Sequence, residues 1–228
     1  MEKSEIGLEL TEEKKFEMLQ KSNYRYDEQK ISTELNRMRR SISKRAVSYV
    51  FYMFHRLANH LCSGVYVDTV GINKIKALMT DKQTRIVLLP LYRSITDIIV
   101  TEYINYLYDI ELGFFFACME DHTDMRLLNE LYKFCGVFLP KRERRHDNSI
   151  NYVNQALFED VLAANKLTTI YQNTKRLRSG KISQPLRADD SIEWILRAQK
   201  NPALQKFNIK IVPVSIYMDR IFDSSLLT

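Results

Sequence analysis

A chain of 228 residues is long enough to bury one substantial hydrophobic core. Hydrophobic residues make up 45% of it and aromatic residues 11%, with only six glycines and five prolines, which excludes a disordered chain and long flexible linkers. The formal net charge of +6 favours anionic partners, which could be phosphorylated metabolites, lipid surfaces or nucleic acid.

The cysteines and the apolar segments bear on compartment and cofactors. Cys62, Cys118 and Cys135 are widely spaced and form no Cys-x-x-Cys pair, so we predict no metal site, no disulfide framework and a reducing, intracellular compartment. The first 40 residues hold no apolar run of the length that export requires, so no signal peptide is predicted. Residues 46–67 are interrupted by polar side chains, which predicts a buried or interfacial helix rather than a membrane span.

Residues 1–42 mix charges of both signs with a few apolar side chains and are predicted to form a charged helical extension. Residues 43–228 are predicted to form one α/β domain. From Ser43 to Leu61 apolar residues recur at steps of three and four, the spacing of one helical face, and Gly64 is the expected end of that helix. His55 and His60 lie on or beside the apolar face, where we expect packed or exposed rather than catalytic histidines.

Short runs typical of β-strands then alternate with helical patterns. Strands are predicted at residues 65–67, 85–89, 112–117, 137–139, 167–171 and 209–215, and helices at 95–108, 124–134, 148–164 and 192–200. This alternation predicts a largely parallel sheet flanked by helices. Ligands of such sheets bind at the carboxyl ends of the strands.

Three loops that follow predicted strands carry polar and basic side chains, and together they could surround one phosphate. Their candidate residues are Tyr92, Arg93, Ser94 and Asp97 in the first loop, Lys141 and Arg142 in the second, and Arg176, Arg178 and Lys181 in the third. Simpler interpretations stay open. Ser94 could cap the helix from Ile95, Asp97 could interact with the dipole of that helix, and residues 141–145 could be a solvated loop.

The segment from Leu88 to Val100 resembles the first signature block of the glycerol-3-phosphate and dihydroxyacetone-phosphate acyltransferases. That block has a proline, two residues, and then His-x-x-x-x-Asp with Arg-Ser directly after the histidine. Tyr92 stands at the histidine position of this block, whereas Arg93, Ser94 and Asp97 match it.

Three further blocks follow in the order of that family. Residues 135–141 are similar to Gly-Ala-Phe-Phe-Ile-Arg-Arg, with a proline in place of the first arginine and Lys141 supplying a cation. Residues 171–178 are similar to Phe-x-Glu-Gly-Thr-Arg-Ser-Arg, with Asn173 in place of the glutamate. Residues 212–215 resemble Val-Pro-Ile-Ser. The resemblance covers roughly residues 45 to 222, and the chain is C-terminally short relative to the family.

The resemblance implies acyl transfer from acyl-CoA, a co-substrate rather than a cofactor, to glycerol 3-phosphate or dihydroxyacetone phosphate. In the family the histidine is the general base and the aspartate orients it. A phenol of pKa ~10 is a poor replacement, so impaired or lost catalysis is expected of Tyr92 with Asp97. The resemblance assigns substrate binding to the predicted cations, together with Ser94.

Two functions remain open: a diverged acyltransferase of glycerophospholipid or ether-lipid synthesis, and a non-catalytic scaffold that binds phosphate, CoA or a protein partner. The family also implies a peripheral membrane setting, in which peroxisome, mitochondrion and endoplasmic reticulum are not distinguished. Nucleic acid is not an expected partner, because the basic residues are split among loops without a known nucleic-acid-binding motif.

Overall fold

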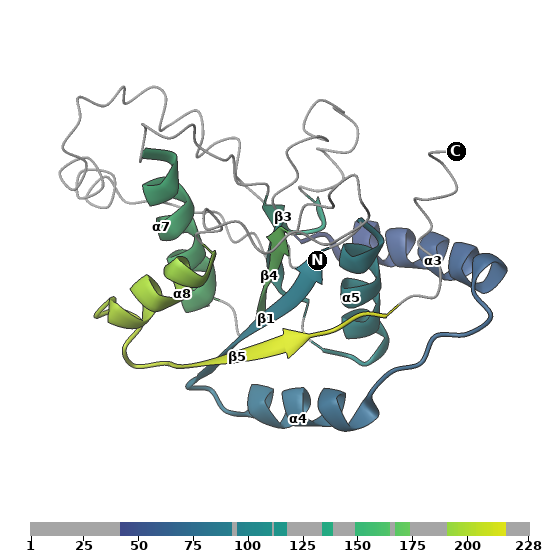
Figure 1. Cartoon of the computed structure of the whole chain (residues 1–228), viewed down its shortest axis with the longest axis horizontal. Helices are drawn as coiled ribbons and strands as arrows, with labels where there is room; N and C mark the ends of the chain where they lie inside the picture. The colour runs from purple at the N-terminus through teal and green to yellow at the C-terminus, as the bar shows by residue number, and fades with distance from the viewer. Residues whose placement is uncertain are drawn as a thin grey trace, which may run out of the picture.

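The computed structural model describes residues 42–92, 95–110, 112–117, 134–138, 149–164, 167–173 and 191–217. Five strands and five helices lie in these ranges (Figure 1). The helices are α3 (Lys44–Leu61), α4 (Thr69–Thr80), α5 (Ile95–Leu107), α7 (Ser149–Ala164) and α8 (Ser191–Lys200). The strands are β1 (Thr84–Tyr92), β2 (Phe114–Ala117), β3 (Val137–Phe138), β4 (Leu167–Asn173) and β5 (Asn208–Val214).

The strands form one sheet in the order β3-β2-β4-β1-β5, and every pairing between them is parallel. The predicted class, a largely parallel sheet flanked by helices, is therefore confirmed. β1 lies between β4 and β5 although the three strands are far apart in the sequence. Val87, for example, is opposite Thr168 on one side and Ile211 on the other. Their carboxyl ends consequently point to the same edge of the sheet.

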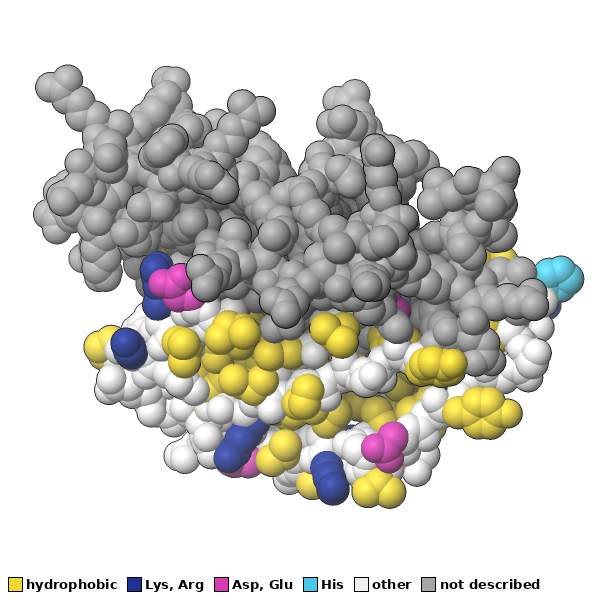
Figure 2. All heavy atoms as spheres, viewed as in Figure 1, with side chains coloured by type: hydrophobic (Ala, Val, Ile, Leu, Met, Phe, Trp, Pro, Cys, Tyr) yellow, Lys and Arg dark blue, Asp and Glu magenta, His cyan; other side chains and the backbone are white. Residues whose placement is uncertain are grey.

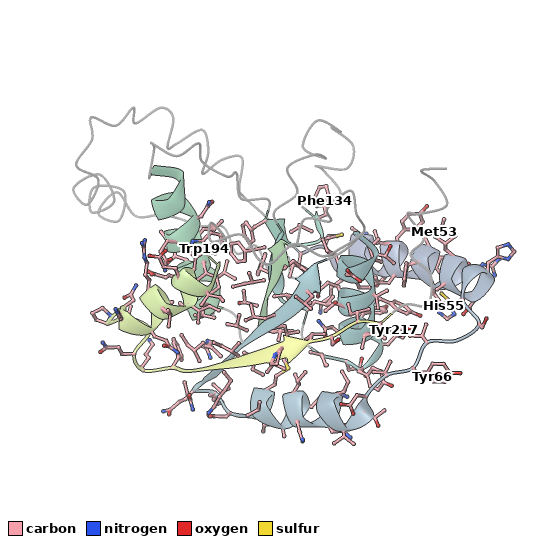
Figure 3. All side chains as sticks on the ribbon, viewed as in Figure 1. Met53, His55, Tyr66, Phe134, Trp194 and Tyr217 are labelled. Atoms are coloured by element: carbon pink, nitrogen blue, oxygen red, sulfur yellow. The ribbon has the colours of Figure 1, made fainter. Side chains whose placement is uncertain are left out.

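Helices cover both faces of the sheet, as a parallel sheet requires. On one face, Val87 and Ile170 pack with α7 and α8 in a core that includes Trp194, which Figure 3 labels beside these helices. On the other face, Ile86 and Leu88 pack against α4 and the end of α5. This alternation along β1 follows from the two-residue period of a strand. α3 lies outside this layer, against α5.

Two predictions in the first part of the domain were wrong. The segment 65–67 is extended but forms no strand, because its β-prone residues have no hydrogen-bonded neighbour. α3 ends at Leu61 with Cys62 as its C-cap, before Gly64. The helix α4 was missed, although its N-cap is clear in the structure: the Asp68 side chain accepts from the backbone N–H groups of Val70 and Gly71.

The remaining predicted strands and helices occur within a few residues of their expected bounds. Residues 1–41 and 118–133 lie outside the described residues, so the predicted extension and nearly all of the helix at 124–134 stay predictions. The predicted boundary between residues 42 and 43 likewise stays a prediction.

Two glycines allow close approaches that hold the short strands β2 and β3 in place. A Cβ on Gly113 would lie only 2.2 Å from the carbonyl oxygen of Leu167, so β2 could not begin this close to β4 with any other residue. Gly136 has a φ of 76°, which favours glycine, and it turns the chain into β3 beside Ile42.

Arg85, near the start of β1, links the sheet to the C-terminal end of α7. Its guanidinium donates to the carbonyl oxygens of Leu162 (2.9 Å) and Ala163 (3.3 Å), which belong to the last turn of α7. It also donates to the carbonyl of Lys82 at 3.0 Å, and its central carbon lies 3.7 Å from the ring centre of Phe207. The side chain thereby satisfies carbonyl groups that the end of a helix leaves without partners.

We expect Arg85→Ala to lower the free energy of unfolding by about 3 kcal/mol, because several buried carbonyl oxygens would lose a charged donor. Arg85→Lys should cause an intermediate loss, since an ammonium group cannot reach all of them as a planar fork does. Urea unfolding measures both. The control is Arg197→Ala, which removes an exposed helical ion pair worth about 0.5 kcal/mol or less. Equal effects of the two alanine substitutions would contradict the role given to Arg85.

Candidate functional site

The candidate site lies at the carboxyl ends of β1 and β4, where two residues singled out by the sequence meet. In the register of these strands Leu91 is opposite Gln172, and Tyr92 is opposite Asn173. Tyr92 is the expected catalytic position of the first block, and Asn173 occupies the glutamate position of the third. The backbones of two distant sequence blocks are therefore direct neighbours.

Asp97 lies in the first turn of α5, five residues after Tyr92, and its side chain is only 1% exposed. The first turn of a helix favours a carboxylate, because the N-terminal end of the helix dipole is positive. The hydroxyl of Thr101 donates to the backbone carbonyl of Asp97 at 2.7 Å, within the helix. The prediction that Tyr92 and Asp97 lie in a loop was wrong, because β1 extends to Tyr92 and α5 already begins at Ile95. The alternative interpretation, in which Asp97 lies in the first turn of that helix, is confirmed.

The structure does not place the other predicted site residues. These are Arg93, Ser94, Lys141, Arg142, Arg176, Arg178 and Lys181, which lie outside the described residues. Their convergence on one anion, and the proposed cap by Ser94, therefore stay predictions. The strands that would lead into their loops, β1, β3 and β4, belong to one sheet and run in the same direction.

A cluster of buried polar side chains between α5 and β4 was not predicted from the sequence. The Tyr171 hydroxyl lies 3.2 Å from Oε1 of Glu102 and 3.3 Å from the carbonyl oxygen of Ile98, and it donates to these two acceptors. Asn105 donates through Nδ2 to the other oxygen of Glu102 at 3.3 Å. These contacts attach the middle of α5 to β4, two residues before Asn173.

One signal in the sequence could have revealed this group. Asp97, Thr101 and Asn105 recur every four residues in a segment that is otherwise largely apolar, which indicates a polar stripe along one side of the helix. Glu102 lies next to that stripe. Because all of these side chains are buried, they need polar partners from a neighbouring element. The identity of that element, β4, follows only from the order of strands.

Burial also changes the acidity of this group. Removal from water raises the pKa of Glu102 from 4.5 to about 7, although the hydrogen bonds from Asn105 and Tyr171 oppose the shift. Burial raises the pKa of Tyr171 well above its usual value, and the nearby negative charge of Glu102 adds to the effect. Tyr171 therefore remains a protonated donor at neutral pH, while Glu102 changes its charge near neutrality.

The other candidate nucleophiles and bases of the described residues have structural roles. Nδ1 of His55 lies 2.5 Å from the Tyr103 hydroxyl, and Nε2 lies 3.0 Å from Nδ2 of Asn59, so this histidine joins α3 to α5. Burial raises the pKa of the Cys135 thiol to about 11, which keeps it protonated. Within the described ranges, no group of three or more His, Cys, Asp or Glu side chains could hold a metal ion.

Comparison with known proteins gives one group of relatives. The chain is 25% identical over 183 residues to a dihydroxyacetone phosphate acyltransferase of Mus musculus, which covers 79% of this chain and 26% of the relative. The enzyme of the same name from Bos taurus is 24% identical over 194 residues (84% and 27%), and that from Homo sapiens is 23% identical over 200 residues (87% and 28%). No family model matches the chain.

These weak similarities support the resemblance to the acyltransferases at a coarse level. They extend over most of this chain, yet the chain spans only about a quarter of the length of these curated relatives. What the relatives act on is therefore a basis for a proposal about this protein.

Glu102 should make the stability of the protein depend on pH. The folded state keeps the Glu102 proton up to a pKa of about 7, whereas the ordinary pKa of a glutamate, which applies to the unfolded chain, is 4.5. The stabilisation from this proton is complete below the lower value, and it declines as pH rises to the higher one, by about 3 kcal/mol in total. Glu102→Gln should abolish that decline, because the amide does not ionise.

Urea unfolding at about pH 5 and about pH 8 measures the effect. Glu193→Gln is the matched control, since Glu193 is an exposed glutamate on α8. The expected result is a pH dependence that is flatter in Glu102→Gln than in both other proteins. A Glu102→Gln protein with the pH dependence of the wild type would show that Glu102 does not hold its proton in the folded state.

Proposed function

We propose that this chain is a diverged acyltransferase-like protein of glycerophospholipid or ether-lipid synthesis, whose acyl transfer is impaired or lost. Its ancestral reaction would pass an acyl group from acyl-CoA to the hydroxyl of glycerol 3-phosphate or dihydroxyacetone phosphate. The observation that carries the proposal is the meeting of β1 and β4, which brings Tyr92 and Asn173 into register, with Asp97 buried in the first turn of the helix that follows β1. The similarity to dihydroxyacetone phosphate acyltransferases supports it independently.

The chemistry of this reaction explains why Tyr92 matters. The acceptor oxygen must lose a proton as it attacks the thioester carbonyl, after which the carbon–sulfur bond breaks and CoA leaves as a thiol. An imidazole accepts that proton near neutral pH, and a carboxylate at the position of Asp97 would hold the ring. A phenol of pKa ~10 is about 0.1% ionised at neutral pH and has no second nitrogen for the carboxylate to orient.

The second candidate function is a pseudoenzyme that binds a phosphate, CoA or a protein partner without turnover. It is favoured by the fact that the two register partners, Tyr92 and Asn173, are both changed relative to the family blocks. A change at one position could adapt a site to a new substrate. Changes at two neighbouring backbone positions, one of them the base, favour loss of the original chemistry.

We also propose a peripheral association with an intracellular membrane, which the resemblance implies. In the described part of the chain, no helix is both long enough and apolar enough to cross a bilayer. Acyl-CoA would serve as a co-substrate if the protein is active, and no cofactor or metal is proposed for the reaction.

Tyr92→His should restore measurable acyl transfer if the remaining site is intact. The wild-type chain is expected to release CoA from a long-chain acyl-CoA barely faster than the buffer, with either acceptor. The histidine should raise this rate by about 10²-fold, the lower range for a positioned general base. Detection of the free thiol in the presence of glycerol 3-phosphate or dihydroxyacetone phosphate measures the rate.

Tyr92→Phe is the matched control, because it changes the same position without adding a base. Combining Tyr92→His with Asp97→Asn should remove the gain, since the ring would lose its orienting carboxylate. A wild-type chain that is rapid and loses activity in Asp97→Ala would contradict the impaired enzyme. Silence of every variant, with phosphate or CoA binding still measurable by calorimetry, would favour the pseudoenzyme.

A further inference from the structure

The helix α3 has two distinct faces, and its inner face packs against α5. The Phe51 ring lies 6.0 Å from Tyr103 and 5.1 Å from Tyr106, and Phe54 lies 5.1 Å from Tyr103. The Ser48 hydroxyl adds a contact of 3.3 Å with the Tyr106 hydroxyl. These contacts attach the inner face of α3 to α5.

The outer face of α3 carries large apolar side chains that are exposed. Tyr49 is 65% exposed, Tyr52 59%, Met53 51% and Leu57 54%. Their successive spacings of three, one and four residues place them along one side of the helix, opposite the buried face. Figure 3 shows Met53 on the side of α3 that points away from α5. Such a concentration of exposed apolar groups on one helix marks an interaction surface.

The charges on α3 specify the chemistry of its partner. The helix contains Lys44, Arg45 and Arg56 and no acidic residue. Arg45, Arg56 and His60 are exposed and fall among the outer apolar side chains on the helical wheel. Exposed aromatic and aliphatic side chains interspersed with cations complement a surface that is apolar below and anionic above.

The exposed apolar residues of α8 provide an instructive contrast. Ile192 and Leu196 are 52% and 53% exposed, close to the values on α3. Beside them, however, Glu193 and Arg197 form an ion pair, so this helix has no excess of cations at that point. Figure 2 shows this face, where hydrophobic side chains over α8 and β5 lie among side chains of both charges. Exposure alone therefore does not distinguish α3, whereas its charge does.

We propose that the outer face of α3 binds the surface of an anionic phospholipid bilayer. The boundary between headgroups and acyl chains takes up Tyr49, Tyr52, Met53 and Leu57. Arg45 and Arg56 contact lipid phosphates. Tyrosine suits this depth because its ring is apolar, whereas its hydroxyl can form hydrogen bonds with water. Arginine side chains can extend their apolar stems along the bilayer while the guanidinium remains among the headgroups. This inference rests on the peripheral membrane association proposed above, to which it gives a surface and a lipid class, and it is independent of acyl transfer.

The binding experiment uses the full chain and vesicles of phosphatidylcholine and phosphatidylserine in a ratio of about seven to three, compared with pure phosphatidylcholine. The wild type should sediment with the anionic vesicles and only weakly with the neutral ones. Arg56→Glu should weaken binding by about tenfold, because it reverses one charge at the surface. Leu57→Ser should weaken it by a similar factor through lost burial. The controls are Lys74→Glu on α4 and Leu196→Ser on α8, which should bind like the wild type.

A second measurement locates the contact. The only tryptophan, Trp194, is buried in the core, so a Trp194→Phe background allows a new tryptophan to report its own surroundings. In that background, vesicles that contain brominated lipids should quench the fluorescence of Tyr52→Trp. They should leave Leu196→Trp unchanged, although Leu196 is as exposed as the residues of the outer face of α3.

Three outcomes would overturn the proposal. The first is equal weakening by the α3 and control substitutions, or quenching of Leu196→Trp but not of Tyr52→Trp, which would assign lipid binding to another surface. The second is no binding of the wild type to either vesicle. The third is a lipid-free dimer in sedimentation that Leu57→Ser dissociates, which would make a second copy of this chain the occupant of α3. Activity of Tyr92→His tests the acyltransferase proposal separately from all three.

Discussion

The parallel pairing of β1 with β4 is the constraint on which the candidate site depends. These strands are separated by more than seventy residues, but their hydrogen bonds continue as far as Tyr92 and Asn173, at the ends of both. Since the register of parallel strands fixes which residues are neighbours, no independent loop geometry is needed to bring these two positions together. β5 on the other edge of β1 makes β1 an interior strand, so its position is fixed from both sides.

The contacts of Tyr171 extend this constraint from the sheet to α5. A single hydroxyl lies between a backbone carbonyl of the helix and the carboxyl group of Glu102, in a region without access to water. Hydrogen bonds in such surroundings are directional and costly to leave unsatisfied, so they fix the rotation of α5 about its axis. That rotation determines where Asp97 points relative to the strand ends. The position of Asp97 thus depends on the contacts of Tyr171 with Ile98 and Glu102.

Much of the fold could be predicted because its strands are dense in β-branched and aromatic residues and its longer helices have a clear apolar period. α4 was missed because only Ile72 and Ile75 are buried among glycine, asparagine and lysine. The candidate site was predicted in part. Tyr92 and Asp97 could be found from the local sequence. That Tyr92 lies beside Asn173, and that Tyr171 contacts Glu102, depends on the order of the strands. Strand order is set by long-range packing, which local patterns do not encode.

Arg85 has a consequence for how this protein could change over time. Its bonds to the end of α7 and its stacking on Phe207 secure the amino-terminal rim of the sheet, at the opposite end from Tyr92. The contacts that hold β1 to α7 and the position expected to carry the catalytic base therefore lie at opposite ends of the same strand. A lineage could lose or exchange catalytic groups at the carboxyl end of β1 without weakening the Arg85 contacts at the amino end. The fold would then persist after the original reaction is lost.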